Sequence, residues 1–328
     1  MRQLRVELTR LRSRRAVVLL LLAATLVTAL LAAGVIWDNR PVTDTQLASA
    51  QAQATAAASE QDVRRDLNTC HHDPQAFFGP GGRAEACDQQ LMPRTEDYLD
   101  RVPLHVGDVR NGRGLALMLL LAAFALIAGT TFAGADWANG SMSTQLLFVP
   151  QRTKVWLAKA AAITLGTALV AAVLLGAFWT TISLVSFDRG APIGQAVAVE
   201  VRWQVLRAVV LAAGAGLGGY ALTMALRHTV AAVGVLFAYA VGGEALVSVI
   251  PLHRVGAWSL GNNVMAWLRN GTRVFDDRLA CAPSLSVCDR HYVVSVGHGA
   301  AYLTVLLAVT LLVSWLTFRH RDTPRPWA

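Results

Sequence analysis

A polar segment at residues 136–156 contains the side chains of this sequence that are best suited to a functional role. It combines an acid, an aromatic residue, a turn signal, a leucine pair, a proline and two cations. In chain order these residues are Asp136, Trp137, Gly140, Ser141, Leu146, Leu147, Pro150, Arg152 and Lys154. The sequence has no His-Glu-x-x-His, no Gly-x-Ser-x-Gly and no paired carboxylates in an apolar run. We therefore do not expect an enzyme.

The order of these residues predicts a short surface helix. Asn139, Gly140 and Ser141 form a turn that ends one helix and caps the next, and Pro150 ends the second helix. A helix over residues 141–149 would lie along the membrane and present side chains to a cytoplasmic protein. In this interpretation Asp136 and Trp137 are at the surface, so replacing them should cost little stability. The alternative is an ordinary surface loop with an interfacial Trp137 and a snorkelling Lys159.

The sequence on both sides of this segment is apolar and uncharged. Residues 114–135 and 160–187 contain no Asp, Glu, Lys or Arg, and each run is long enough to cross a hydrocarbon core of about 30 Å as a helix. Over the whole chain of 328 residues, 54% are hydrophobic and only 15% are charged. Counting such runs predicts an all-α polytopic membrane protein with six transmembrane helices.

The expected order places the spans at 16–37, 114–135, 157–187, 205–226, 229–250 and 292–318. On the cytoplasmic side we expect a basic amphipathic helix at 1–15, a coupling segment at 136–156 and a tail at 319–328. A solvated basic tail is the alternative for residues 1–15. The external segments are then 38–113, 188–204 and 251–291. In this orientation Lys and Arg are about twice as dense inside as outside, and most of the 21 acids lie outside. The net charge of +8 therefore indicates topology, and we expect no nucleic-acid partner.

All four cysteines fall in the external segments, which predicts disulfides in an oxidising compartment. We favour the pairs Cys70–Cys87 and Cys281–Cys288, while pairing across the two loops stays open. A metal site beside Cys70, using His71 and His72, is a weaker alternative because zinc-type spacing is missing.

The external segments also contain helix signals. The stretch from 45 to 68 has good helix propensity and predicts a small helical cap. In 251–291 we expect short re-entrant or interfacial helices, anchored by Trp258 and Trp267, or an ordinary surface loop.

Glu244 is the single acid inside a predicted span. A buried ionisable group indicates a function or a partner. Three alternatives stay open for it: a structural or gating acid bonded to Tyr239, Arg207 or a nearby helix N-terminus, a substrate contact, or a proton relay. The glycines at 242–243 and the run 214–219 would allow neighbouring helices to approach closely.

No nucleotide site is encoded, since the only lysines are Lys154 and Lys159 and neither follows a glycine. The residues do carry a resemblance. The segment with Asp136-Trp137, Gly140-Ser141, Leu146-Leu147, Pro150-Gln-Arg152 and Lys159 is similar to the loop after the second span in permease subunits of type-2 ATP-binding-cassette exporters. Asp136 replaces the more usual Glu, and Glu244 matches a frequent feature of the actinobacterial members.

The resemblance implies a permease that forms a pathway as a homodimer or with a similar permease. ATP and Mg would be bound by a separate ATPase subunit, and this chain would bind no cofactor. We expect it in the plasma membrane, surrounded by lipid, with both termini cytoplasmic. Two other functions stay open. One is a secondary transporter, which would need repeated three-plus-three organisation and several intramembrane charges or broken helices. The other is a sensor or assembly factor that acts through its external cap.

Overall fold

The computed structural model describes residues 2–78, 83–99, 104–190, 192–250, 252–276 and 290–320. It contains six helical stretches that are long and apolar enough to cross a membrane. They are α2 (Arg15–Asp38), Val106–Ala138, α10 (Arg152–Asp188), α11 (Gln195–Leu226), Thr229–Val247 and α15 (Val296–His320). The predicted six apolar helices are thus present, and their length and composition are consistent with a polytopic membrane protein.

The ends of these helices differ from the expected spans, because charged residues do not stop a helix. α11 begins well before residue 205 and includes Glu200 and Arg202, whose side chains are exposed. α15 begins later than expected, at Val296, since His291–Val294 form a strand. A lack of charge therefore locates an apolar run but not the ends of the helix that contains it.

The chain divides into two compact units. The first comprises Met1–Ala32, Gly107–Leu184 and Ile193–Ala328, and the second Ala33–Val106 and Val185–Pro192.

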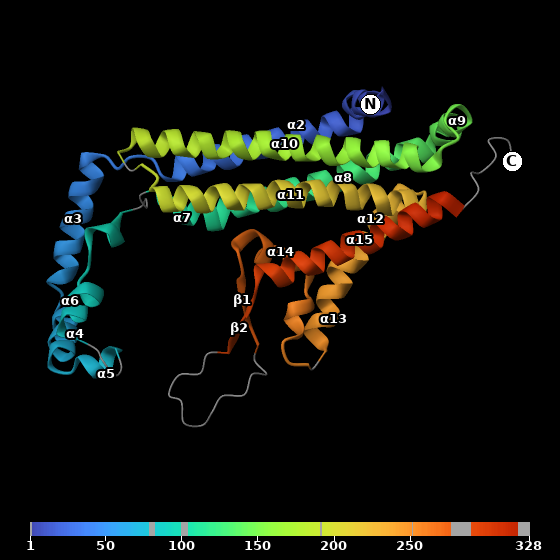
Figure 1. Ribbon diagram of the computed structural model, residues 1–328. Helices are drawn as coiled ribbons and strands as arrows, with labels where there is room; N and C mark the ends of the chain where they lie inside the picture. The colour runs from blue at the N-terminus through green and yellow to red at the C-terminus, as the bar shows by residue number, and fades with distance from the viewer. Residues whose placement is uncertain are drawn as a thin grey trace. The chain divides into compact units, whose positions relative to one another are not determined.

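In the first unit, α8 (Leu115–Ala138) packs along α11 in the same direction (Figure 1). Glycines permit this close contact. A Cβ atom at Gly129 would lie 2.0 Å from the Gly216 carbonyl oxygen, and one at Gly219 would lie 2.3 Å from that of Leu126. The predicted close approach is thus present at Gly216 and Gly219.

The other predicted glycine pair behaves differently. Gly242 and Gly243 have nothing within 4 Å of a Cβ position among the described residues. Gly242 is the last residue of a π-helical turn, Ala238–Gly242, and Gly243 is the first residue of α13 (Gly243–Val249). The turn joins α12 (Thr229–Phe237) to α13. A second π-helical turn, Arg110–Gly114, joins α7 (Val106–Val109) to α8.

The region before α15 contains short elements. A 3₁₀ turn, Val255–Trp258, precedes α14 (Leu260–Arg269), which packs against α15. An antiparallel ribbon of β1 (Thr272–Phe275) and β2 (His291–Val294) follows, with Thr272 opposite Val294. This ribbon departs from the all-α expectation. Trp258 is exposed, while Trp267 donates its indole N–H to the Arg207 carbonyl at 2.9 Å.

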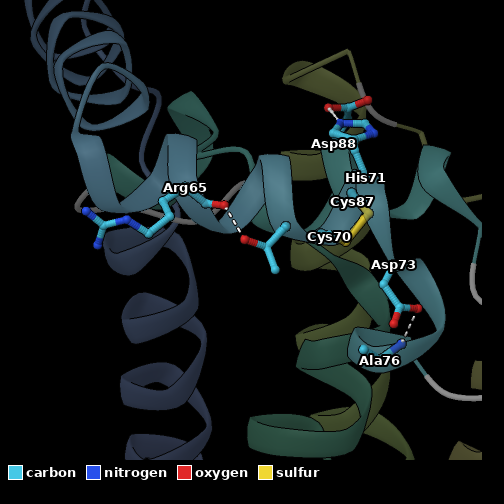
Figure 2. Close-up of a disulfide and its surroundings, with 8 residues drawn as sticks. Arg65, Cys70, His71, Asp73, Ala76, Cys87 and Asp88 are labelled. Carbon is cyan, nitrogen blue, oxygen red and sulfur yellow. Dashed lines mark hydrogen bonds and ion pairs between the residues drawn. A yellow bond between two sulfur atoms is a disulfide. The ribbon is translucent and has the colours of Figure 1, made fainter.

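The second unit is a set of short helices: α3 (Asp44–Ala58), α4 (Gln61–His72), α5 (Pro74–Phe78), α6 (Ala84–Leu91) and a 3₁₀ turn, Thr95–Tyr98. The predicted disulfide between Cys70 and Cys87 joins α4 to α6, and both residues are fully buried (Figure 2).

Beside the disulfide, His71 lies 3.1 Å from an Asp88 carboxylate oxygen (Figure 2). The described residues contain no group of three or more His, Cys, Asp or Glu that could hold a metal. Cys281 and Cys288 lie outside the described residues.

Candidate functional site

The predicted coupling segment folds as a turn, a short helix and the start of a long helix. α8 ends at Ala138, and Gly140 takes a left-handed φ of 66°, which turns the chain into α9 (Ser141–Phe148). The Ser141 hydroxyl donates to Asp136 Oδ1 at 2.9 Å and so fixes the start of α9 to the last turns of α8. Pro150 lies in the short link to α10, as its chemistry requires.

A group of four charged side chains, which we call the ion cluster, lies beneath this turn. It consists of Glu7, Arg14, Asp136 and Lys159. Lys159 Nζ lies 2.7 Å from Asp136 Oδ2 and 2.9 Å from Glu7 Oε2, and Arg14 pairs with Asp136 Oδ1. Lys159 is 0% exposed, Asp136 2% and Glu7 1%. These two cations and two anions balance, which is the condition under which buried charges are tolerated. The more exposed Arg10 adds a further ion pair to Glu7 Oε1, at 3.4 Å.

Four helices meet at the ion cluster. Glu7 comes from α1 (Arg2–Ser13), Asp136 from α8 and Lys159 from α10. α9 contributes Gln145, whose amide donates to Glu7 Oε1 at 2.8 Å. The Phe132 ring closes one side, 4.9 Å from the Arg14 guanidinium carbon and 5.4 Å from Lys159 Nζ. The N-terminal helix is thereby fastened to the coupling segment.

These contacts correct two expectations. Asp136 is not a surface acid, and Lys159 does not snorkel, since both are buried and paired with each other. Removing one partner of a buried pair typically costs about 3–5 kcal/mol, because the other charge stays buried without compensation. Replacing Asp136 must therefore disturb folding, contrary to the small cost expected from the sequence.

An aromatic layer connects the same region to other helices. The Trp156 indole N–H donates to the Ser314 hydroxyl of α15 at 3.1 Å, and the Tyr220 hydroxyl of α11 donates to the Trp156 carbonyl at 2.9 Å. Trp137 is half-buried and packs edge-on against Phe318 at 6.4 Å between ring centroids. Movement of this segment would thus be transmitted to α8, α10, α11 and α15.

The remaining residues of the predicted segment divide by exposure. Leu146 is half-buried against the core, whereas Leu147 and Phe148 are 80% and 83% exposed. Pro150 and Lys154 are exposed, and the half-buried Arg152 donates to the Phe318 carbonyl at 3.4 Å. α9 therefore has a fixed base and an apolar, uncovered tip.

Glu7 and Arg14 are the site residues that sequence reasoning missed. Glu7 lies on the same face of α1 as Leu4, Leu8 and Leu11, of which Leu11 is 7% exposed. An acid within the apolar stripe of an amphipathic helix is the signal that could have revealed a buried partner.

Glu244 has no contact with the ion cluster. Its carboxylate accepts from the Ser259 hydroxyl at 2.7 and 2.9 Å and from the Gly261 N–H at 2.9 Å. Ser259 is the N-cap of α14, so the carboxylate faces a helix N-terminus, which favours negative charge. Of the three structural partners weighed from the sequence, the structure has the helix N-terminus. Arg207 instead donates to Asn270. The hydroxyl groups of Tyr239 and Tyr302 share a hydrogen bond in which either can be the donor.

Comparison with models of protein families, with curated proteins and with solved structures found no match for this chain.

Proposed function

We propose that this protein is the membrane-spanning permease subunit of an ATP-binding-cassette exporter, coupled to a separate ATPase. The observation that carries the proposal is α9, a helix between two apolar spans whose base is fixed by the ion cluster and whose tip exposes Leu147 and Phe148. A surface of this kind suits docking of a cytoplasmic protein. The similarity of residues 136–159 to the family's loop supports the same function.

The contacts around α9 support a coupling role in mechanical terms. A force on the exposed tip is passed to Gln145 and Ser141, and from them to Glu7 and Asp136. Because Lys159 joins both carboxylates in a buried site, α1, α8 and α10 cannot move independently without separating buried charges. The segment therefore behaves as one rigid part.

The proposal includes the partners that such a subunit requires. Two permease subunits, identical or similar, would form the pathway, and two ATPase subunits with ATP and Mg would dock beneath them. Both termini would be cytoplasmic, and the protein would reside in the plasma membrane. The second unit, with its own disulfide, supports an alternative in which the cap binds an external ligand or protein as a sensor or assembly factor.

Copurification tests the proposal directly. We expect the tagged full chain, isolated in mild detergent from its own cells, to retain an ATPase subunit. L147S together with F148S should abolish this association, because polar residues remove the apolar tip without touching the ion cluster. The matched control is T144A, an exposed position on the same helix, which should keep the ATPase.

Both variants should insert and migrate on a sizing column as the unmodified chain does. Retention of the ATPase by the L147S/F148S chain, or absence of an ATPase from the unmodified chain, would contradict the proposal. A protein captured through the second unit would favour the cap alternative.

A further inference from the structure

A cavity of about 510 Å³ lies in the first unit, at the opposite end of α8 and α11 from the ion cluster. We call it the arginine cavity, because Arg110, Arg207 and Arg269 line it together with a single carboxylate, Glu200. Its walls come from the π-helical turn before α8, the first part of α11 and the end of α14. Its volume is in the range of small-ligand sites.

The charges in this cavity do not balance. Arg110 pairs with Glu200, whose side chain is 60% exposed. Arg207 donates to the Asn270 side chain at 2.9 Å, and Arg269 to the Asn111 carbonyl at 3.1 Å, and both of these acceptors are neutral. Within the described part of the chain, neither guanidinium has a carboxylate partner. Three cations against one anion favour an anionic ligand.

Two buried polar atoms in the same cavity have no hydrogen-bond partner among the described residues. One is a donor, Nε of Arg110, and the other is an acceptor, Oε1 of Gln204. Gln204 is 5% exposed, so bulk water does not satisfy it. An unsatisfied buried group costs stability and calls for a partner. The ligand should therefore carry both an acceptor for the arginine and a donor for the glutamine.

We propose that the arginine cavity binds a phosphate group whose carrier also offers a hydroxyl or ammonium group. Guanidinium groups bind phosphate through short, charge-assisted hydrogen bonds, which accounts for the arginines. The second group of the carrier donates to Gln204. A phospholipid headgroup and a soluble phosphate ester share this chemistry. Val199 and Trp203 at the cavity are exposed apolar side chains that suit the acyl chains of a lipid.

The site does not depend on the proposed transport function, because it uses none of the residues of the coupling segment. From the sequence, Arg207 was a possible partner for Glu244. The structure assigns Arg207 to the arginine cavity instead.

Native mass spectrometry of the purified full chain tests the site with three probes: dihexanoyl phosphatidylglycerol, dihexanoyl phosphatidylcholine and glycerol 3-phosphate. We expect saturable binding of phosphatidylglycerol, and about tenfold weaker binding of phosphatidylcholine, which has a phosphate but no donor group. Binding of glycerol 3-phosphate as well identifies a soluble phosphate ester as sufficient. Its failure to bind identifies the lipid as the ligand.

Four variants test where the ligand binds. R207Q and R269Q should each weaken binding roughly tenfold, and R202Q, an exposed arginine on the same helix outside the cavity, should leave it unchanged. Q204L should remove the preference for phosphatidylglycerol over phosphatidylcholine without lowering the thermal midpoint of the free protein. The Arg269 side chain is exposed, so replacing it should not prevent folding, and R269Q remains informative if R207Q fails to fold. Equal binding of both lipids by the unmodified chain, or unchanged binding in R269Q, overturns the proposal.

Discussion

The ion cluster and the arginine cavity are both rich in charge, but they satisfy it differently. In the ion cluster two cations face two anions, the exposed Arg10 adds an ion pair to Glu7, and each carboxylate has at least two hydrogen-bond donors. In the arginine cavity cations outnumber anions and two buried polar atoms lack partners. A closed, neutral set of charges holds helices together, whereas an open, unbalanced set is suited to a ligand.

The largest effect is expected from K159M. The methionine keeps the length of the side chain but leaves Glu7 and Asp136 buried without their shared cation. We expect the free energy of unfolding to fall by about 3–5 kcal/mol, measured by thermal or denaturant unfolding in detergent. K154M, at an exposed position on the same helix, is the control and should leave stability unchanged. Equal stability of K159M and the unmodified chain would show that the ion cluster does not hold α1, α8 and α10 together.

G129A should produce the next largest effect. Its new methyl group would meet the Gly216 carbonyl at 2.0 Å, on the contact between α8 and α11 that runs from one site to the other. Overpacking of this kind costs about 1–3 kcal/mol, and here we expect the upper end because backbone must move. The control is G176A on α10, where no described residue lies within 4 Å of the added atom. A G129A chain as stable as G176A would contradict this account of the packing.

A smaller, restoring effect is expected when E7Q is combined with K159M. The double variant removes one cation and one anion, leaving the neutral pair of Arg14 with Asp136. We expect it to recover about 1–2 kcal/mol of what K159M loses, measured as the coupling term of a double-mutant cycle. Strict additivity of the two changes would show that Glu7 and Lys159 do not interact.

The smallest effect is expected from Q204L in the arginine cavity. Gln204 Oε1 has no partner among the described residues. Replacing the glutamine should therefore leave the free energy of unfolding unchanged or raise it by up to about 1 kcal/mol. The matched comparison is N263L. Asn263 is fully buried, and its Oδ1 likewise has no partner among the described residues, but its amide nitrogen donates to the Ala257 and Ser259 carbonyls at 2.7 Å. N263L removes these two bonds and should therefore destabilise. A large loss in Q204L would mean that this glutamine serves the fold.

The sequence predicted local features well and long-range ones poorly. Uncharged runs located the six apolar helices, and the turn at Gly140 with Pro150 located α9 within one residue. The ion cluster was not predictable in this way, because Glu7 and Lys159 are 152 residues apart. A charge near the end of a span has the same sequence context whether it is buried or exposed. The β ribbon was not predicted, because its two strands are only four residues long each and are separated in the chain.

Long sequence separation also sets the order in which this protein is assembled. Chains are synthesised at about 5–20 residues per second, so Glu7 leaves the ribosome on the order of ten seconds before Lys159 does. Until Lys159 has been synthesised, the carboxylate of Glu7, and later that of Asp136, lacks the cation that the two will share. α1 therefore cannot take its final place until α10 has been made and inserted, and the ion cluster marks the moment at which the N-terminal half of the bundle is complete.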